Sequence, residues 1–152
     1  MNELTLIPIP PYNLKRIWQK ACIVIAQMPL LPPCMRLIAI KWGGVKIKEK
    51  CFIGSNVQFD GIHPNLIEIG NGCIITTGTT ILSHFYNTKD GRFYSGKVRI
   101  GENVFIGTNT IIINAVDIGN GAVIGAGSVV NRDIPSYELW AGNPARFIKK
   151  LE

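Results

Sequence analysis

A chain of 152 residues is long enough for one well-buried domain and too short to expect two. Hydrophobic residues make up 47% of it and charged residues 17%, which excludes a disordered chain and a coiled coil, and 24 isoleucines against 10 leucines disfavour an all-α fold. The net charge of +6 suits an anionic ligand. Because there is no run of five basic residues, no zinc-finger spacing and no aromatic RNA-binding signature, we expect no nucleic-acid partner.

The first 42 residues differ in composition from the rest of the chain. They hold six of the nine prolines and none of the 16 glycines, and their pattern predicts irregular chain with short helices near 14–27 and 34–41. We therefore expect a partly helical capping segment over residues 1–42 and a repeat domain over residues 43–152.

An apolar stretch at 21–31 follows Lys15, Arg16 and Lys20, as in a signal peptide. Prolines interrupt this stretch, no small-residue cleavage site follows it, and a bilayer span would need about twenty apolar residues. We expect a helix packed on the body of the protein, and we leave a contact with a membrane surface open without support from the sequence.

A repeat of six residues begins after Gly43. Every sixth residue is aliphatic or aromatic in three blocks, which are Ile47, Ile53 and Phe59, then Ile69, Ile75 and Ile81, then Ile100, Ile106, Ile112, Ile118, Ile124 and Val130. A period of six excludes an α-helix, whose apolar stripe recurs at 3.6, and it is too regular for alternating antiparallel strands. It predicts short strands joined by tight turns, with three strands in each 18-residue coil and four to five coils in all. Glycines after the repeat positions suit corners that need a positive φ or close backbone approach.

The four cysteines lie 12, 17 and 22 residues apart and form no C-x-x-C pair. This spacing supports neither a disulfide framework nor a zinc ribbon, so we expect buried, reduced thiols in a cytoplasmic protein. Cys51 and Cys73 each lie two residues before a repeat position, and we expect them to point inward as small hydrophobes.

Two interruptions of the repeat hold both histidines of the chain. Loops must leave the coils near 60–65 and near 84–97. His63 precedes Pro64 in the first interruption, where a surface loop position is expected. His84 lies where the repeat gives way to the second loop, which places its imidazole at the edge of a coil.

The chain resembles the hexapeptide-repeat acyltransferases, most closely the galactoside/maltose type and the O-acetyltransferases of bacterial polysaccharides. The resemblance covers 45–150 and rests on the I-G-x-x-x-x repeat, the loop at His84, and the segments V-R-I-G-E-N-V-F-I-G-T-N, V-I-G-A-G-S-V-V-N-R-D-I-P and A-G-N-P-A-R-F-I-K-K. It implies a mainly β fold, a left-handed parallel β-helix, and a homotrimer with active sites between neighbouring subunits. Handedness itself does not follow from the spacing.

His84 coincides with the family's catalytic histidine. An imidazole with an ordinary pKa of about 6.5 is suited to take the proton of an acceptor hydroxyl near neutral pH. The resemblance implies the backbone N–H of Thr108 as donor to the tetrahedral oxyanion. The group that orients His84 stays open between Asp60, Asp90, a backbone carbonyl and a group on a neighbouring subunit, because this sequence has Ser83-His84 where some relatives have Asp-His.

The resemblance also implies acetyl-CoA as the acyl donor, without a metal. The cofactor residues it implies are Thr108 and Ala126 along the pantetheine arm, Asn131 and Arg132 in the same groove, and Arg146 and Lys149 in the C-terminal tail at the phosphates. A solvated basic end is the alternative for these cations. The candidate acceptor contacts are Asp60, Asn87 and Phe105, and Phe105 could equally be a packing residue.

These observations favour an acetyl-CoA-dependent O-acetyltransferase that acts on a hydroxyl of a sugar or envelope polysaccharide precursor. An N-acetyltransferase of a nucleotide amino sugar, serine or a xenobiotic is the enzymatic alternative. A zinc carbonic anhydrase on the same solenoid would need three imidazoles at each metal, and the chain has two histidines. A non-catalytic trimeric scaffold is the alternative from another class.

Overall fold

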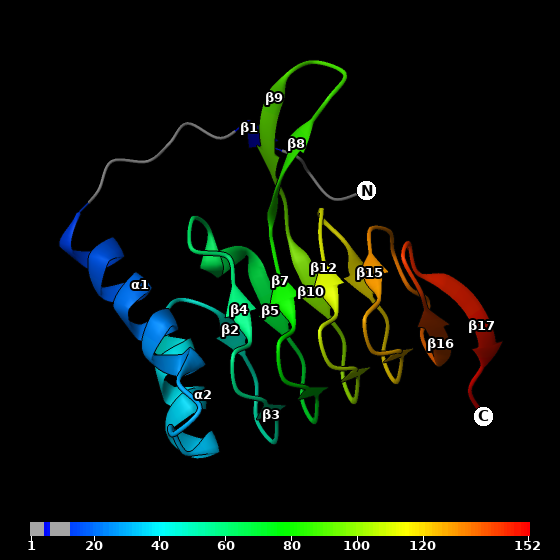
Figure 1. Ribbon diagram of the computed structural model, residues 1–152, viewed down its shortest axis with the longest axis horizontal. Coiled ribbons are helices and arrows are strands. Elements are labelled where there is room, and N and C mark those ends of the chain that lie inside the picture. The colour runs from blue at the N-terminus through cyan, green and yellow to red at the C-terminus, as the bar shows by residue number, and fades with distance from the viewer. Residues whose placement is uncertain (1–4, 7–12) are drawn as a thin grey trace.

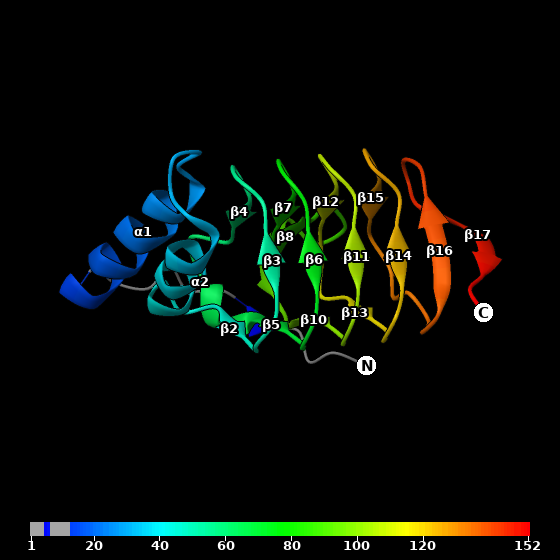
Figure 2. The ribbon, with the colours of Figure 1, turned by 90° about the horizontal axis from the view of Figure 1, so that it is seen from below.

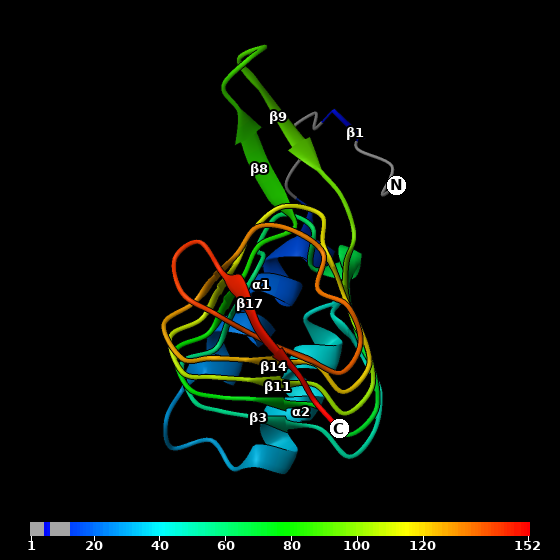
Figure 3. The same cartoon turned by 90° about the vertical axis from the view of Figure 1, so that its right-hand side faces the viewer.

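Short parallel strands form three sheets, which are arranged like the faces of a triangular prism in the view along its axis (Figure 3). The structure is a computed structural model that describes residues 5–6 and 13–152. Sheet one contains β2 (Lys46–Ile47), β5 (Ile67–Ile69), β10 (Val98–Ile100) and β13 (Asp117–Ile118). Sheet two contains β3 (Phe52–Ile53), β6 (Ile74–Ile75), β11 (Phe105–Ile106), β14 (Val123–Ile124), β16 (Glu138–Ala141) and β17 (Arg146–Lys150). Sheet three contains β4 (Gln58–Phe59), β7 (Thr80–Ile81), β12 (Ile111–Ile112) and β15 (Val129–Val130).

The repeat positions stack in register from one coil to the next. In sheet two, for example, Ile53 pairs with Ile75, Ile75 with Ile106, and Ile106 with Ile124. All four of these side chains are buried inside the prism. The predicted period of six and the inward direction of its aliphatic residues are therefore confirmed.

Each tight turn at a corner of the coils has two special positions, one where the backbones approach closely and one where φ is positive. A Cβ added to Gly54 would lie 2.5 Å from the backbone nitrogen of Thr77 in the next coil, so glycine permits the close stacking of coils. The positive φ of the turn occurs two residues later, at Asn56 (54°), and the equivalent position of the next coil is Gly78 (77°). The repeat glycines thus permit close approach, and the left-handed conformation occurs further along the turn, mostly at Asn or Gly and at two corners at Lys50 and Tyr137.

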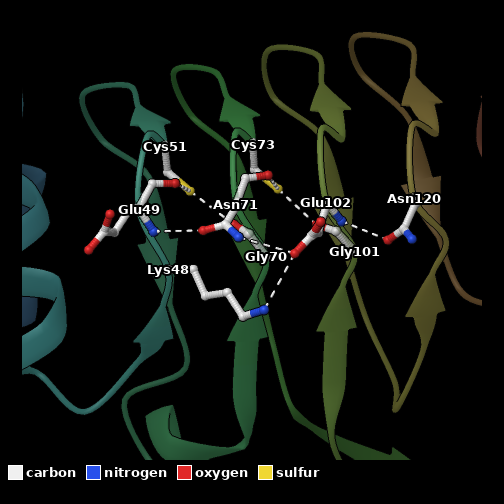
Figure 4. Close-up of polar contacts among 9 residues, drawn as sticks. All are labelled: Lys48, Glu49, Cys51, Gly70, Asn71, Cys73, Gly101, Glu102 and Asn120. Carbon is white, nitrogen blue, oxygen red and sulfur yellow. Dashed lines mark hydrogen bonds and ion pairs between the residues drawn. The ribbon is translucent and has the colours of Figure 1, made fainter.

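Figure 4 shows the corner between sheets one and two, where polar groups join neighbouring coils. The side-chain oxygen of Asn71 accepts from the backbone N–H of Glu49, and the thiols of Cys51 and Cys73 donate to the carbonyls of Gly70 and Gly101, each across 3.0 Å. Burial raises the pKa of the Cys73 thiol to about 11, so it is an inert packing group.

Three of the four cysteines are buried, as expected, but Cys34 is exposed. The expectation of buried thiols was wrong for this residue, because Cys34 lies in the first turn of a helix, on a side that residues 13–152 leave exposed. All four cysteines are free thiols.

Two helices, α1 (Leu14–Gln27) and α2 (Pro33–Trp42), pack against the first coil at one end of the prism (Figures 1 and 2). The guanidinium of Arg36 is buried between them, where it donates to the carbonyl of Ala26 in α1 at 3.0 Å and to that of Ile53 in β3 at 2.9 Å. Both helices occur where the sequence predicted them. The division into a capping segment and a repeat domain stays a prediction, since one continuous core joins the helices to the coils.

Both predicted interruptions of the repeat occur in the structure. The first contains a short 3-10 helix, Pro64–Leu66. The second is a hairpin of β8 (His84–Asn87) and β9 (Arg92–Ser95) that projects from the prism, and β1 (Thr5–Leu6) pairs antiparallel with β9 (Figure 1). At the far end, β17 turns back antiparallel on β16. Among the helices that the structure describes, none is long and apolar enough to cross a membrane.

Candidate active site

The strands of sheet three all end at one edge of the prism, because they run parallel. The residues that follow those strands therefore line this edge, which we call the carboxyl edge of sheet three. They include Asp60 after β4, Ser83 and His84 after β7, Asn114 after β12 and Asn131 after β15. The hairpin leaves the prism from this edge, starting at His84.

Asp60 and His84 form a dyad at the carboxyl edge. Oδ2 of Asp60 lies 2.6 Å from Nδ1 of His84, and the same oxygen accepts from the hydroxyl of Ser83 at 2.6 Å and from its backbone N–H at 2.9 Å. The other oxygen, Oδ1, accepts from the backbone N–H groups of Ile62 and His63. The Asp60 side chain is fully buried, whereas 24% of the His84 side chain is exposed.

These contacts determine which nitrogen of His84 carries the proton. Burial alone would raise the pKa of Asp60, but the hydrogen bonds from Ser83, His84 and the two backbone groups lower it from its ordinary 3.8 to about 2. The carboxylate is therefore ionised at neutral pH and accepts only, so Nδ1 of neutral His84 is the protonated nitrogen. The partly exposed ring is left with an unprotonated Nε2, which is the state that a general base requires.

His63 is half-buried at the start of the 3-10 helix, with exposed Gly61 and Ile62 just before it. Its Nε2 atom is buried and has no hydrogen-bond partner within the described part of the chain. Burial lowers the pKa of His63, and the nearby charge of Asp60 only partly opposes this effect. The expected surface loop position is therefore met only in part, because the residue is partly exposed while its Nε2 atom is buried.

Thr108 and Ala126 lie together, but at the opposite edge of sheet three. Thr108 is in the turn between β11 and β12, and Ala126 is in the turn between β14 and β15 directly over it. A Cβ on Gly107 would collide with the backbone nitrogen of Ala126, and the carbonyl of Thr108 accepts from the N–H of Gly127 at 2.8 Å. Both residues are exposed at this edge.

The other residues expected to bind the cofactor are exposed, but they lie in two separate places. Asn131 and Arg132 follow β15 at the carboxyl edge. There the carbonyl of Asn131 accepts from the side-chain amide of Asn114. Arg146 and Lys149 lie on β17, at the end of the prism far from the helices (Figure 1). An elongated ligand would be needed to touch both groups.

The candidate acceptor residues Asn87 and Phe105 do not lie beside His84 in this chain. Asn87 ends β8, where its side chain accepts from the backbone of Lys89 and shapes the hairpin turn. Phe105 lies on the outer face of sheet two, whereas His84 leaves sheet three. Asp90, another candidate partner for His84, binds Tyr94 and the backbone of Arg92 within the hairpin instead.

Ser83 is the member of this site that the sequence did not identify. Its hydroxyl and its backbone both bind Asp60, so it helps to hold the carboxylate in place. The pairing of Phe59 with Ile81 sets the register that places Asp60 next to Ser83. That register was implicit in the repeat phase on the two sides of the first interruption.

Comparison with known proteins gives consistent results. Residues 44–83 match the family "Hexapeptide repeat of succinyl-transferase", and residues 97–132 match "Bacterial transferase hexapeptide (six repeats)". A putative acetyltransferase of Bacillus subtilis strain 168, YvoF, is 40% identical over 108 residues, which are 71% of this chain and 62% of the relative. Protein CapG of Staphylococcus aureus is 40% identical over 116 residues, which are 72% of this chain and 67% of that protein. The chain thus spans about two thirds of the length of either relative.

Among solved structures, a galactoside acetyltransferase in complex with coenzyme A superimposes with a TM-score of 0.67 at 27% identity, over 91% of this chain and 81% of that one. The family matches and the solved structure agree with the stacked coils and with the sequence repeat. The chain therefore belongs to the hexapeptide-repeat acyltransferases.

Proposed function

We propose that this chain transfers the acetyl group of acetyl-CoA to a hydroxyl of a sugar or envelope polysaccharide precursor, with His84 as general base. The observation that carries the proposal is the dyad, in which ionised Asp60 leaves the proton of His84 on Nδ1 and so keeps Nε2 available. The coenzyme A complex of the galactoside acetyltransferase and the acetyltransferase relative support the choice of donor.

The reaction follows from this arrangement. Nε2 of His84 takes the proton from the acceptor hydroxyl as its oxygen attacks the carbonyl carbon of the thioester. The imidazolium that forms is stabilised by the carboxylate of Asp60, 2.6 Å from Nδ1. As the tetrahedral intermediate collapses, the C–S bond breaks and the imidazolium returns its proton to the thiolate, which yields an ester and free coenzyme A.

The remaining residues have supporting roles in the proposal. The N–H of Thr108 from a neighbouring subunit stabilises the oxyanion, and the backbone of Ala126 continues the slot for the pantetheine arm. Asn131 and Arg132 lie at the carboxyl edge, so in the proposal they line this groove from the subunit that supplies His84, opposite the Ala126 edge of its neighbour. Arg146 and Lys149 meet the phosphates of the donor. Asn87 and Phe105 contact the acceptor from the hairpin and from the neighbour. The coils form a left-handed β-helix in a homotrimer.

The proposal is tested by measuring thiol release from acetyl-CoA with a panel of sugars and glycans, for the unaltered chain and for His84→Ala. We expect release with a hydroxyl acceptor and a loss of about a hundredfold or more in His84→Ala. His63→Ala, which alters the other histidine of the chain, should keep most of the activity. Release only with amino sugars or serine would instead indicate an N- or serine acetyltransferase, and full activity of His84→Ala would refute the catalytic assignment.

A further inference from the structure

Helix α1 has a second apolar face, opposite the one that packs on the prism. Its buried face contains Cys22, Ile23 and Ala26. The apolar side chains of the outer face and of the C-cap lie on one side of the helix at 3.6 residues per turn, and each is at least 43% exposed: Leu14, Ile17, Trp18, Val24, Ile25 and Met28. Packing on one side of such a helix leaves its second apolar face exposed to water, and apolar helix faces are normally buried.

Helix α2 and the connection between the helices extend this surface. Met35, Ile38 and Trp42 are exposed at i, i+3 and i+7, and Leu30 in the connection is 97% exposed. The rings of Trp18 and Trp42 lie 6.3 Å apart, between centroids, and an open hollow of about 300 Å³ joins the two helices there. We call the exposed apolar residues of α1, α2 and their connection the helical apolar face.

The charge around this face has one sign. From Leu4 to Lys48 the sequence has seven basic residues and no Asp or Glu. Arg36 is buried, but Lys15, Lys20 and Lys41 on the helices are exposed. With 3.6 residues per turn, Lys20 lies beside the apolar stripe of α1, whereas Lys15, in the first turn, lies in line with Cys22 and Ala26 and is exposed there.

We propose that the helical apolar face docks on the surface of an anionic lipid bilayer. The apolar stripe would enter the boundary between headgroups and acyl chains, the two tryptophans would lie at the headgroup level, and the exposed lysines of the two helices would meet lipid phosphates. A second copy of this chain fits the surface poorly, because it would bring two basic ends without acidic residues against each other. This inference is independent of the acetyl-transfer reaction.

Co-sedimentation of the full chain with lipid vesicles tests the proposal. We expect binding to vesicles of phosphatidylglycerol and phosphatidylcholine in equal parts, little binding to phosphatidylcholine alone, and strong weakening in about 1 M salt, which shortens the screening length to about 3 Å. Tryptophan emission should shift to the blue on binding. Absence of binding to the mixed vesicles, or equal binding to both kinds, would overturn the proposal.

Matched variants locate the contact. Trp18→Ser with Ile25→Ser should weaken vesicle binding by about tenfold or more, and Lys15→Glu with Lys41→Glu by a similar factor. Ile148→Ser and Lys89→Glu alter exposed residues far from the helices and should leave binding unchanged. Equal loss in the control variants would overturn the proposal. So would self-association that Trp18→Ser abolishes without any vesicle binding, because a second copy would then cover the face.

Discussion

Asp60 connects two parts of the chain through the two oxygens of one buried carboxylate. Oδ2 binds Ser83 and His84 at the start of the hairpin, and Oδ1 binds the backbone of the first interruption at Ile62 and His63. The carboxylate must be ionised to accept all of these bonds. Its charge is therefore linked both to the stability of the fold and to the state of the base.

The lowered pKa of Asp60 predicts a loss of stability in acid. Its folded-state pKa of about 2 lies below the ordinary 3.8, so the ionised carboxylate stabilises the fold above about pH 4. This contribution, about 2 kcal/mol, should disappear as the pH falls from about 4 towards 2. Urea unfolding over this range measures it, and Asp60→Asn should be less stable at neutral pH and less sensitive to acid. If Asp60→Asn showed the same acid dependence as the unaltered chain, the carboxylate would not be its source. Asp90→Asn in the exposed hairpin is the control.

The tautomer argument predicts that Asp60→Asn is nearly inactive even where it is folded. An asparagine amide that donates to Nδ1 leaves the proton of His84 on Nε2, which can then no longer accept a proton from the acceptor. We expect kcat to fall by about a hundredfold or more with little change in KM for acetyl-CoA. Ser83→Ala removes one hydrogen bond from the same carboxylate and should cost less. Unchanged kcat in Asp60→Asn would mean that another group orients His84.

The coils could be predicted from the sequence because each one must close on itself after three strands. That requirement makes the spacing of residues such as Ile53, Ile75 and Ile106 sufficient to place the coil strands up to β15 and both interruptions, but not the hairpin strands or β16 and β17. The partner of His84 could not be chosen in the same way, because the pairing of Phe59 with Ile81 brings Asp60 near Ser83 but does not say which side chain the ring of His84 turns toward. Arg36 donates four hydrogen bonds to backbone carbonyls of α1, of the connection between the helices and of the first coil. No pattern in the sequence predicts these bonds either.

Close stacking of the coils predicts that a methyl group at a corner is not tolerated. A Cβ at Gly54 would approach a backbone nitrogen of the next coil at 2.5 Å, and backbone cannot move aside as a side chain can. We expect Gly54→Ala to lower stability by about 1–3 kcal/mol. Gly61→Ala is the matched control, since its added Cβ would meet only the end of the Lys20 side chain at 4.0 Å. Thermal unfolding of the two variants should differ by several degrees, and equal melting temperatures would contradict close stacking as the reason for glycine.

At the scale of the whole molecule, sheet two shows an apolar outer face as well as a buried inner one. Strands β3, β6 and β11 lie side by side in this sheet (Figure 2). Their pairing joins Phe52 to Ile74 and Ile74 to Phe105, and these side chains are 47%, 42% and 39% exposed. Such a patch on a prism face is suited to contact between copies of the chain. It agrees with the homotrimer that we expect from the resemblance to the family.

The position of the oxyanion donor gives a sharper reason to expect shared sites. In one chain Thr108 precedes β12 and His84 follows β7, so the two lie at opposite edges of sheet three. A donor at one edge and a base at the other cannot act on the same carbonyl unless a neighbouring subunit brings its Thr108 edge to the His84 edge. A cyclic trimer does this three times, once at each interface.

Mixed trimers test this arrangement. His84→Ala removes the base, Thr108→Pro removes the backbone N–H, and each variant alone should be inactive. When the two are co-expressed in equal amounts, a given interface pairs an intact base with an intact donor in about one case in four, so about a quarter of the activity should return. Circular dichroism and sedimentation of Thr108→Pro show whether it folds and assembles. If both variants assemble and their mixture stays inactive, the base and the donor belong to the same chain, and the shared site is wrong.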